Sequence, residues 1–415
     1  GSEMCIRDRT RLDRVLGLTR ENLTGVRVVR AFDKEQSEID RFEDANALLT
    51  GMQLHVGHLS ALMNPLTYVL INLAIVALLY VGSIEINVGG MASGDVIALV
   101  NYMNQILVEL VKLANLIVQV SKALACAGRV QAVLDTKPGM EFPAELTGNV
   151  PAERAGDAVR FDHVSLTYKG AGAPSLSDIN FTAKRGQTIG VIGGTGSGKS
   201  SLVNLIPRFY DATGGTVSIG GVNVRRLHQA DLRAMLGYVP QKGVLFTGDI
   251  LSNLEFGGDV SEADAIRAAA TAQAEDFIWS RPHHFLTPVA QGGANVSGGQ
   301  RQRLSIARAI AKHPQVYLFD DSFSALDYQT DAALRQALAR QTHDATVLIV
   351  AQRLSTILHA DQILVLDGGR IVGRGTHSAL LRSCETYREI ALSQLSAAEL
   401  GEAVSYTHLT LPTIR

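Results

Sequence analysis

Cysteine is almost absent from this chain, which contains only Cys5, Cys126 and Cys384 in 415 residues. These residues are far apart in the sequence, so their spacing excludes a disulfide framework and a cysteine-rich metal site and favours a reducing compartment. Charged residues are also scarce, at 19% compared with about 25% in ordinary soluble domains. The net charge is only −2, which argues against a nucleic acid as the main partner.

Charge is nearly missing from residues 59–86, where Glu85 is the single charged residue. Within this stretch residues 69–81 are almost entirely apolar, and about twenty such residues cross a bilayer as a helix. Pro65 lies near the start, where proline is tolerated because neighbouring groups in a membrane protein satisfy the carbonyl that it frees. We predict a membrane helix at about 59–82; the alternative is a buried helix of a soluble core.

A second candidate membrane helix, at about 96–118, contains more polar residues. They are Asn101, Asn104, Gln105, Glu109, Lys112 and Asn115. Polar groups within a membrane usually face a protein interior or a watery cavity, so the first four, which recur at helical spacing, would line a translocation path. The alternative is that the later half of this helix leaves the membrane and that Glu109 pairs with Lys112 in solvent.

The positive charges predict the orientation of both helices. Residues 83–95 contain no Lys or Arg, whereas the segment before residue 59 contains Arg11, Arg14, Arg20, Arg27, Arg30, Lys34 and Arg41. Because Lys and Arg are enriched in cytoplasmic flanks, the connection at 83–95 should face outward. Both flanks, including the whole C-terminal part, should then be cytoplasmic in a multi-pass protein of the cell membrane.

A phosphate-binding pattern, G-x-x-x-x-G-K-[ST], lies near the middle of the chain. Its residues are Gly193, Gly194, Thr195, Gly196, Ser197, Gly198, Lys199 and Ser200. An apolar strand-like run precedes it and a helix-like run from Ser201 follows, so backbone N–H groups can converge on an anion. Lys199 would reach the β- and γ-phosphates of ATP, and Ser200 would ligate Mg²⁺. The alternative is a glycine-rich turn without a ligand.

Two further segments extend this site. The apolar run at 316–320 ends in Asp320, which would lie beside the Mg²⁺ directly or through water. Residues 297–299, Ser-Gly-Gly, form a small-residue turn before a helix-like run, so the free N–H groups there would form a second anion-binding position.

Together these motifs resemble the ABC transporter ATPases, whose signature sequence is close to L-S-G-G-Q. The signature residues here are Ser297, Gly298, Gly299 and Gln300. Tyr168, Gln241 and the run from Ser324 to Asp327 agree with the family in order and spacing. The resemblance implies that Tyr168 stacks on adenine, that Gln241 senses the γ-phosphate and the metal, and that Asp327 and its neighbours contact a facing subunit. It also implies two domains placed head to tail, each signature clamping the other domain's nucleotide.

Two positions depart from the family's usual residues. Active members have Glu after Asp320 to orient the attacking water, whereas this chain has Asp321. Its carboxylate stands about 1.5 Å further back, and a displacement of about 1 Å can cost roughly a hundredfold in rate. Gln352 replaces the usual His, and an amide cannot titrate. We predict that Asp321, Gln352 and Gln241 form the reaction centre of a site that binds ATP but hydrolyses it slowly.

A site of this kind favours an asymmetric heterodimer with a second ABC half-transporter, as in bacterial heterodimeric multidrug-type exporters. The intact signature of this chain would complete the partner's active site. The alternative is a homodimeric exporter with two active sites. The transported molecule stays open among small molecules, lipids and peptides, and we expect no nucleic-acid partner.

The N-terminal part resembles an exporter membrane domain. Residues 20–32 resemble the coupling segment that docks on a nucleotide domain in ABC exporters; the alternative is a charged amphipathic helix without such a partner. Half-transporters of this type have six membrane helices and only the last two are recognised here, so we expect an N-terminally truncated chain. The predicted fold class is an α-helical membrane segment, the C-terminal part of an ABC exporter membrane domain, followed by an α/β P-loop ABC ATPase domain with a helical subdomain.

These patterns divide the chain into segments. Residues 11–134 form the membrane part, 135–157 a linker rich in Pro and Gly, and 158–401 the nucleotide-binding domain. Residues 1–10 and 402–415 resemble translated adapter sequence and are set aside. Soluble ABC-type ATPases of DNA repair and separate importer ATPase subunits are rival interpretations, and the apolar segments before residue 135 disfavour both.

Overall fold

The computed structural model describes residues 2–143, 156–258, 260–342 and 344–395. The chain forms two compact units, Gly1–Lys137 and Pro138–Arg415. The predicted tail at 402–415 and most of the predicted linker lie outside the described residues.

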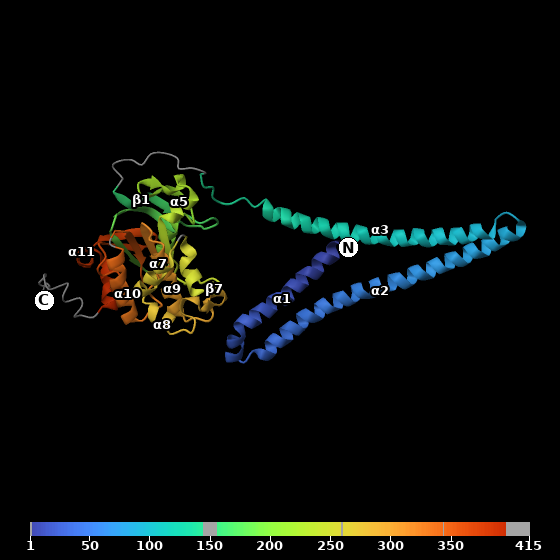
Figure 1. Ribbon diagram of the computed structural model, residues 1–415, viewed down its shortest axis with the longest axis horizontal. Helices are drawn as coiled ribbons and strands as arrows, with labels where there is room; N and C mark the ends of the chain where they lie inside the picture. Colours follow the sequence, from blue (N-terminus) through green and yellow to red (C-terminus); the bar gives the residue numbers. More distant parts are fainter. Residues whose placement is uncertain (1, 144–155, 259, 343, 396–415) are drawn as a thin grey trace, which may run out of the picture. The chain divides into compact units, whose positions relative to one another are not determined.

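The first unit consists of three helices, α1 (Ser2–Ala31), α2 (Glu35–Val88) and α3 (Ser93–Leu134). Helix α1 turns back along α2 (Figure 1), and its residues 2–10 belong to the segment set aside as adapter-like. Leu18 of α1 and Ala45 and Leu49 of α2 are buried, and the Arg11 guanidinium donates to the Leu48 carbonyl oxygen at 3.1 Å. The predicted coupling segment forms the C-terminal part of α1 and the turn that follows.

Helices α2 and α3 are joined by a short turn, and α2 continues without a break through Pro65. Gly89 ends α2 with φ +82°, a conformation that side chains with a Cβ rarely adopt. Next to the turn, a Cβ on Gly82 would lie 2.8 Å from a methyl group of Val96, so glycine permits this close packing.

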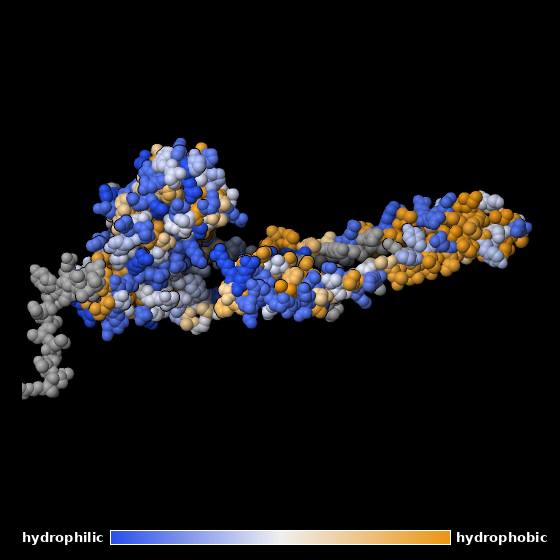
Figure 2. Space-filling model, turned by 90° about the horizontal axis from the view of Figure 1, so that it is seen from below, coloured by the Kyte–Doolittle hydropathy of each residue, from blue (hydrophilic) through white to orange (hydrophobic). Residues whose placement is uncertain are grey.

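Two stretches of these helices are long and apolar enough to cross a membrane, Pro65–Val88 and Ser93–Leu113. They overlap the predicted helices at 59–82 and 96–118, but the first is displaced toward the turn, because the helix continues to Gly89. Hydrophobic side chains cover the ends of α2 and α3 that meet at this turn (Figure 2).

The described residues of the second unit form three β-sheets. The first has the order β2-β1-β4-β5, the second β12-β11-β3-β10-β9-β6, and the third pairs β7 with β8. The strands are β1 (Asp157–Leu166), β2 (Leu176–Lys184), β3 (Thr188–Gly193), β4 (Gly214–Ile219), β5 (Val222–Asn223), β6 (Leu236–Val239), β7 (Gly248–Asp249), β8 (Pro288–Val289), β9 (Val316–Asp320), β10 (Thr346–Val350), β11 (Gln362–Asp367) and β12 (Arg370–Gly375). Helices α4 to α12 surround the sheets (Figure 1). They are α4 (Lys199–Leu205), α5 (Gln229–Ala234), α6 (Ile250–Leu254), α7 (Glu262–Thr271), α8 (Glu275–Trp279), α9 (Gly298–Ala311), α10 (Tyr328–Gln341), α11 (His377–Ser383) and α12 (Glu385–Gln394).

The six-stranded sheet separates two hydrophobic cores. Along β9, Tyr317 and Phe319 contribute to one core and Val316 and Leu318 to the other, because successive side chains of a strand point to opposite faces. The first core includes the Ala-rich face of α7 packed with α9, and this is the predicted helical subdomain. The second core joins the sheet to α4 and to the four-stranded sheet.

The strand order brings three loops together. β10 pairs in parallel with both β3 and β9, and Val350 at its end faces Val191 on one side and Asp320 on the other. Ligands of open parallel sheets bind beside the carboxyl ends of the strands. Lys199 begins the helix that follows the loop after β3, and the loops after β9 and β10 carry Asp321 and Gln352, so these residues lie at one edge of the sheet.

Candidate nucleotide-binding site

The phosphate-binding loop follows β3 and is shaped by glycine. A Cβ on Gly193 would lie 2.1 Å from the carbonyl oxygen of Leu366, so only glycine fits there. The Lys199 ammonium donates to the carbonyl oxygens of Gly193 (2.9 Å) and Gly194 (2.7 Å). Burial lowers the pKa of Lys199, and the Asp321 and Asp320 carboxylates oppose that effect. A partly buried cation that donates to two carbonyl oxygens suits an incoming phosphate.

A buried hydroxyl in the same loop supports this interpretation. Ser197 is only 4% exposed, and its Oγ has no hydrogen-bond partner among the described residues. Buried polar groups are normally hydrogen-bonded, so an orphan of this kind fits a ligand oxygen. The donor chemistry of the loop therefore fits a phosphate chain.

The predicted metal residues are in direct contact. Ser200 Oγ donates to Oδ1 of Asp320 at 3.0 Å, although the two residues are 120 positions apart in the sequence. Asp320 is 5% exposed. Burial raises the pKa of its carboxyl group, the Ser200 hydrogen bond lowers it, and the neighbouring Asp321 charge raises it. A hydroxyl and a carboxylate in this arrangement fit Mg²⁺, which would neutralise the buried charge and polarise the phosphates.

No cluster of three or more His, Cys, Asp or Glu side chains able to hold a metal ion lies in the part of the chain that the structure describes. Mg²⁺ at a nucleotide site needs only one or two protein ligands, because phosphate and water oxygens supply the others.

Asp321 lies at the centre of the predicted reaction residues. It is 6% exposed, and its backbone adopts φ +48°, an uncommon conformation for a residue other than glycine. Two side-chain amides donate to the same oxygen, Oδ2: Gln352 at 2.6 Å and Gln241 at 3.1 Å. The structure thus brings together the three residues that the sequence predicted for the reaction centre.

The predicted adenine-stacking residue, Tyr168, follows β1 and is tied to the phosphate-binding segment. Its hydroxyl donates to Oγ of Ser201 at 2.9 Å. Its ring meets the Tyr210 ring edge to face, with centroids 4.9 Å apart. Sequence reasoning missed Tyr210, since no motif marks it and only the fold brings it to Tyr168.

The signature residues lie at the start of α9 in a capping box. Ser297 Oγ accepts from the Gln300 backbone N–H at 3.2 Å, and Gln300 Oε1 accepts from the Ser297 backbone N–H at 3.1 Å. Both Ser297 and Gly298 are exposed. Asp327, also exposed, caps α10 by accepting from the Thr330 N–H at 2.9 Å, and the bonds from Thr330 lower the pKa of the Asp327 carboxyl group. These two segments are available to a second molecule.

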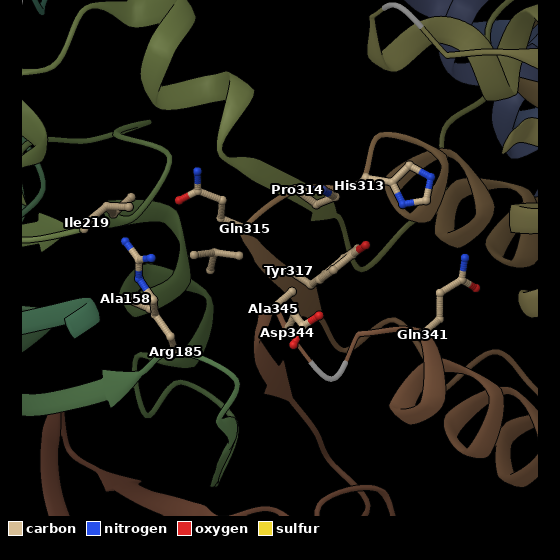
Figure 3. Close-up of a pocket in the computed structure, with 12 residues that line it drawn as sticks. Ala158, Arg185, Ile219, His313, Pro314, Gln315, Tyr317, Gln341, Asp344 and Ala345 are labelled. Carbon is tan, nitrogen blue, oxygen red and sulfur yellow. The ribbon is translucent and has the colours of Figure 1, made fainter. Parts of the chain in front are cut away.

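A cavity of about 260 Å³ lies elsewhere in this unit, where β9 begins (Figure 3). Arg185, His313 and Tyr317 are among the residues that line it. None of the predicted nucleotide-binding residues borders this cavity. It therefore does not belong to the site at the carboxyl ends of the strands.

Two family models match the chain. The model described as ABC transporter transmembrane region matches residues 3–110, and the model described as ABC transporter matches residues 176–324. An uncharacterized ABC transporter ATP-binding protein of Mycobacterium tuberculosis is 42% identical over 394 residues, which cover 94% of this chain and 67% of that protein. An ATP-dependent lipid A-core flippase of Vibrio vulnificus is 35% identical over 382 residues, 92% of this chain and 64% of the flippase.

A solved structure also resembles most of the chain. It is described as a bacterial Atm1-family ABC exporter with ATP bound, and it superposes with a TM-score of 0.83 at 28% sequence identity. The match covers 95% of this chain and 69% of that one. The chain thus spans about two thirds of the length of the proteins that it resembles.

Proposed function

The chain belongs to the ABC transporter family, with a membrane region fused to an ATPase region, and from this premise we propose that it is the slowly hydrolysing subunit of a heterodimeric exporter. The observation that carries the proposal is the contact between Asp321 and Gln352, the two residues that depart from the family's usual Glu and His. The sheet and the helical membrane part agree with an exporter half-transporter, and these exporters act as dimers in a bilayer.

In this proposal ATP is the substrate and each residue of the site has a separate task. Lys199 and the N–H groups of residues 194–200 hold the β- and γ-phosphates. Tyr168 supports the adenine ring. Ser200 and Asp320 would hold Mg²⁺, which would neutralise charge on the phosphates, and Gln241 would sense the γ-phosphate and the metal. The orphan hydroxyl of Ser197 supports phosphate binding in this loop.

Slow hydrolysis follows from the groups around Asp321. A carboxylate that acts as a general base must reach the attacking water, and the Asp side chain is one methylene shorter than Glu. The two amide donors hold its Oδ2 in one place, so the short side chain cannot shift toward a more distant water. Gln352 cannot accept a proton in place of histidine. The site is therefore suited to binding ATP more than to hydrolysing it.

The exposed signature supports a role toward a partner. The capping box uses the N–H groups of Ser297 and Gln300, and the exposed Gly298 lies between them at the start of α9, a helix of 14 residues. A partner half-transporter with Glu and His at the corresponding positions would place its nucleotide there. A homodimer with two equal sites is the second candidate, since the signature and phosphate-binding loop of this chain are both intact.

The membrane part supports export across the cell membrane. The spans Pro65–Val88 and Ser93–Leu113 form two crossings, with residues 11–134 as the membrane part, 135–157 as the linker and 158–401 as the cytoplasmic nucleotide domain. Residues 20–32 couple the two parts. The cargo is a small molecule, a lipid or a peptide, and the similarity to a lipid A-core flippase favours a lipid.

The test is hydrolysis by the full chain in lipid nanodiscs, measured with enzyme in excess over ATP so that slow turnover is resolved. The native chain should bind ATP tightly and turn it over slowly. The double substitution Asp321→Glu with Gln352→His should raise the rate by about a hundredfold. Lys199→Ala is the matched control that removes binding. Fast turnover by the native chain alone would favour the homodimer and overturn the proposal.

A further inference from the structure

The last residue of α12, Gln394, bridges two backbone groups of the loop that carries Gln352. Its Nε2 donates to the carbonyl oxygen of Gln352 at 2.9 Å, and its Oε1 accepts from the Leu354 N–H at 2.7 Å. The bridged residues lie about forty positions earlier in the chain. One planar amide that binds both a carbonyl and an N–H restricts the loop in position and in orientation.

The helix that presents Gln394 is firmly attached to the core. Tyr387 and Ala391 on its inner face are completely buried. The Tyr387 hydroxyl lies 2.7 Å from Nδ1 of His377, and Arg388 Nε donates to the carbonyl oxygen of Leu381 at 3.0 Å. Because α12 is held along its length, the Gln394 amide starts from a rigid element.

A second helix holds the same loop from its other end. Arg335 of α10 donates to the carbonyl oxygen of Ser355 at 2.8 Å, and its guanidinium is paired with Asp331 at 3.1 Å. Asp331 is 2% exposed, so this arginine is fixed in turn. The short segment between Gln352 and Ser355 is therefore fastened to α12 and to α10 through its backbone.

The fastened loop determines where the Gln352 side chain points. Gln394 binds the backbone carbonyl of Gln352, whose carbon is bonded to the same Cα that carries the side chain. The amide of that side chain lies 2.6 Å from Oδ2 of Asp321. A displacement of about 1 Å at a reacting group can cost on the order of a hundredfold in rate. A loosened loop would move the amide away from Asp321 by such an amount.

We propose that Gln394 is a positioning residue for ATP hydrolysis, which acts by holding the loop that places Gln352 on Asp321. It does not touch ATP, and it acts only through the backbone of Gln352 and Leu354. This inference rests on the proposed role of Asp321 in activating water. Removal of the Gln394 amide lowers the rate of the chemical step and leaves nucleotide affinity in place.

The experiment compares variants of the full chain in lipid nanodiscs, with single-turnover hydrolysis and ATP affinity measured on each. Gln394→Ala should lower the rate about tenfold and change affinity less than about twofold. Gln394→Glu keeps an acceptor for the Leu354 N–H but cannot donate to Gln352, so its rate should lie between the rates of Gln394→Ala and the native chain. Ser393→Ala is the control, because the Ser393 hydroxyl donates to Ile390 within its own helix, and its rate should equal that of the native chain.

Hydrogen exchange supplies a readout that does not depend on turnover. The Leu354 amide should exchange faster in Gln394→Ala than in the native chain or in Ser393→Ala, because its acceptor is gone. Unchanged exchange, an unchanged rate, or a fall in ATP affinity that accounts for the whole loss would each overturn the positioning role. Asp321→Asn separates the two proposals. If it hydrolyses as fast as the native chain, the role of Asp321 is wrong; if it is slow while Gln394→Ala is normal, only the role of Gln394 fails.

Discussion

The side-chain amide of Gln352 lies 2.6 Å from Oδ2 of Asp321, the shortest of the contacts that hold this carboxylate. The two residues follow the ends of neighbouring parallel strands, β10 and β9, where Val350 pairs with Asp320. Their contact is therefore a direct consequence of strand register, and a change in either side chain acts on the other.

Removal of the Gln352 amide tests this contact. In Gln352→Ala, Asp321 keeps only the Gln241 donor, so the carboxylate loses one of its two restraints. We expect the single-turnover rate to fall by about tenfold with little change in ATP affinity. A rate equal to or above that of the native chain would show that Gln352 does not position Asp321.

Mixed dimers test the head-to-tail arrangement. One chain carries the repair Asp321→Glu with Gln352→His together with Ser297→Arg, which blocks its signature. The other is native except for Lys199→Ala, which removes phosphate binding. Neither chain alone forms a complete working site, but the mixture joins the repaired phosphate-binding loop to an intact signature. Hydrolysis should return only on mixing, since each site needs both molecules.

A mixture that contains Ser297→Arg in both chains is the matched control, and it should stay inactive. Hydrolysis by the repaired Ser297→Arg chain alone would contradict the arrangement, because that chain has no intact signature to offer.

Asp320→Asn tests whether the buried, charged carboxylate of Asp320 lowers the stability of the folded state. Burial raises the pKa of Asp320, so its protonated form favours folding and this contribution is lost as the pH rises through the folded-state pKa. In nucleotide-free protein at pH 7, the neutral Asn should raise the melting temperature by about 2 °C. The difference should shrink toward acid pH, where the native carboxyl group is protonated. A thermal scan against pH measures both effects.

In Asp320→Asn, ATP with Mg²⁺ should raise the melting temperature less than it does in the native chain, because a carboxylate ligand for the metal is lost. Asp327→Asn is the control, because the pKa shift of Asp327 has the opposite direction. Hydrogen bonds from Thr330 lower the pKa of Asp327, so removal of its charge should not raise the melting temperature at pH 7. Equal behaviour of the two variants would show that burial of Asp320 carries no cost.

Tyr168 allows a test of adenine stacking. Tyr168→Ala removes the ring and should weaken ATP binding about tenfold, the typical effect of losing one aromatic–base contact. Tyr168→Phe keeps the ring and loses only the bond to Ser201, so binding should change by less than about threefold. Calorimetric titration of ATP measures both. Equal losses in the two variants would assign the effect to the hydroxyl group.

Much of the site could be predicted from sequence because its parts are local. The phosphate-binding pattern needs glycine where a Cβ would strike the Leu366 carbonyl, and it needs Lys199 at a set spacing from Gly193. The apolar run before Asp320 likewise predicts a strand with a carboxylate at its end. The helices were harder to delimit, because Gly89 stops α2 later than the apolar pattern indicated.

Residue types within single segments were enough to predict the phosphate-binding loop, the signature, the two apolar helices and the departures at Asp321 and Gln352. Which of these segments contact one another depends on the tertiary structure. β10 lies between β3 and β9 although it follows both in the chain, and this order places two amides on one carboxylate oxygen. Tertiary structure likewise brings Tyr210 to Tyr168 and Gln394 to the backbone of Gln352. Such contacts depend on sheet order and helix packing, which arise from the burial of the whole core and not from any local pattern.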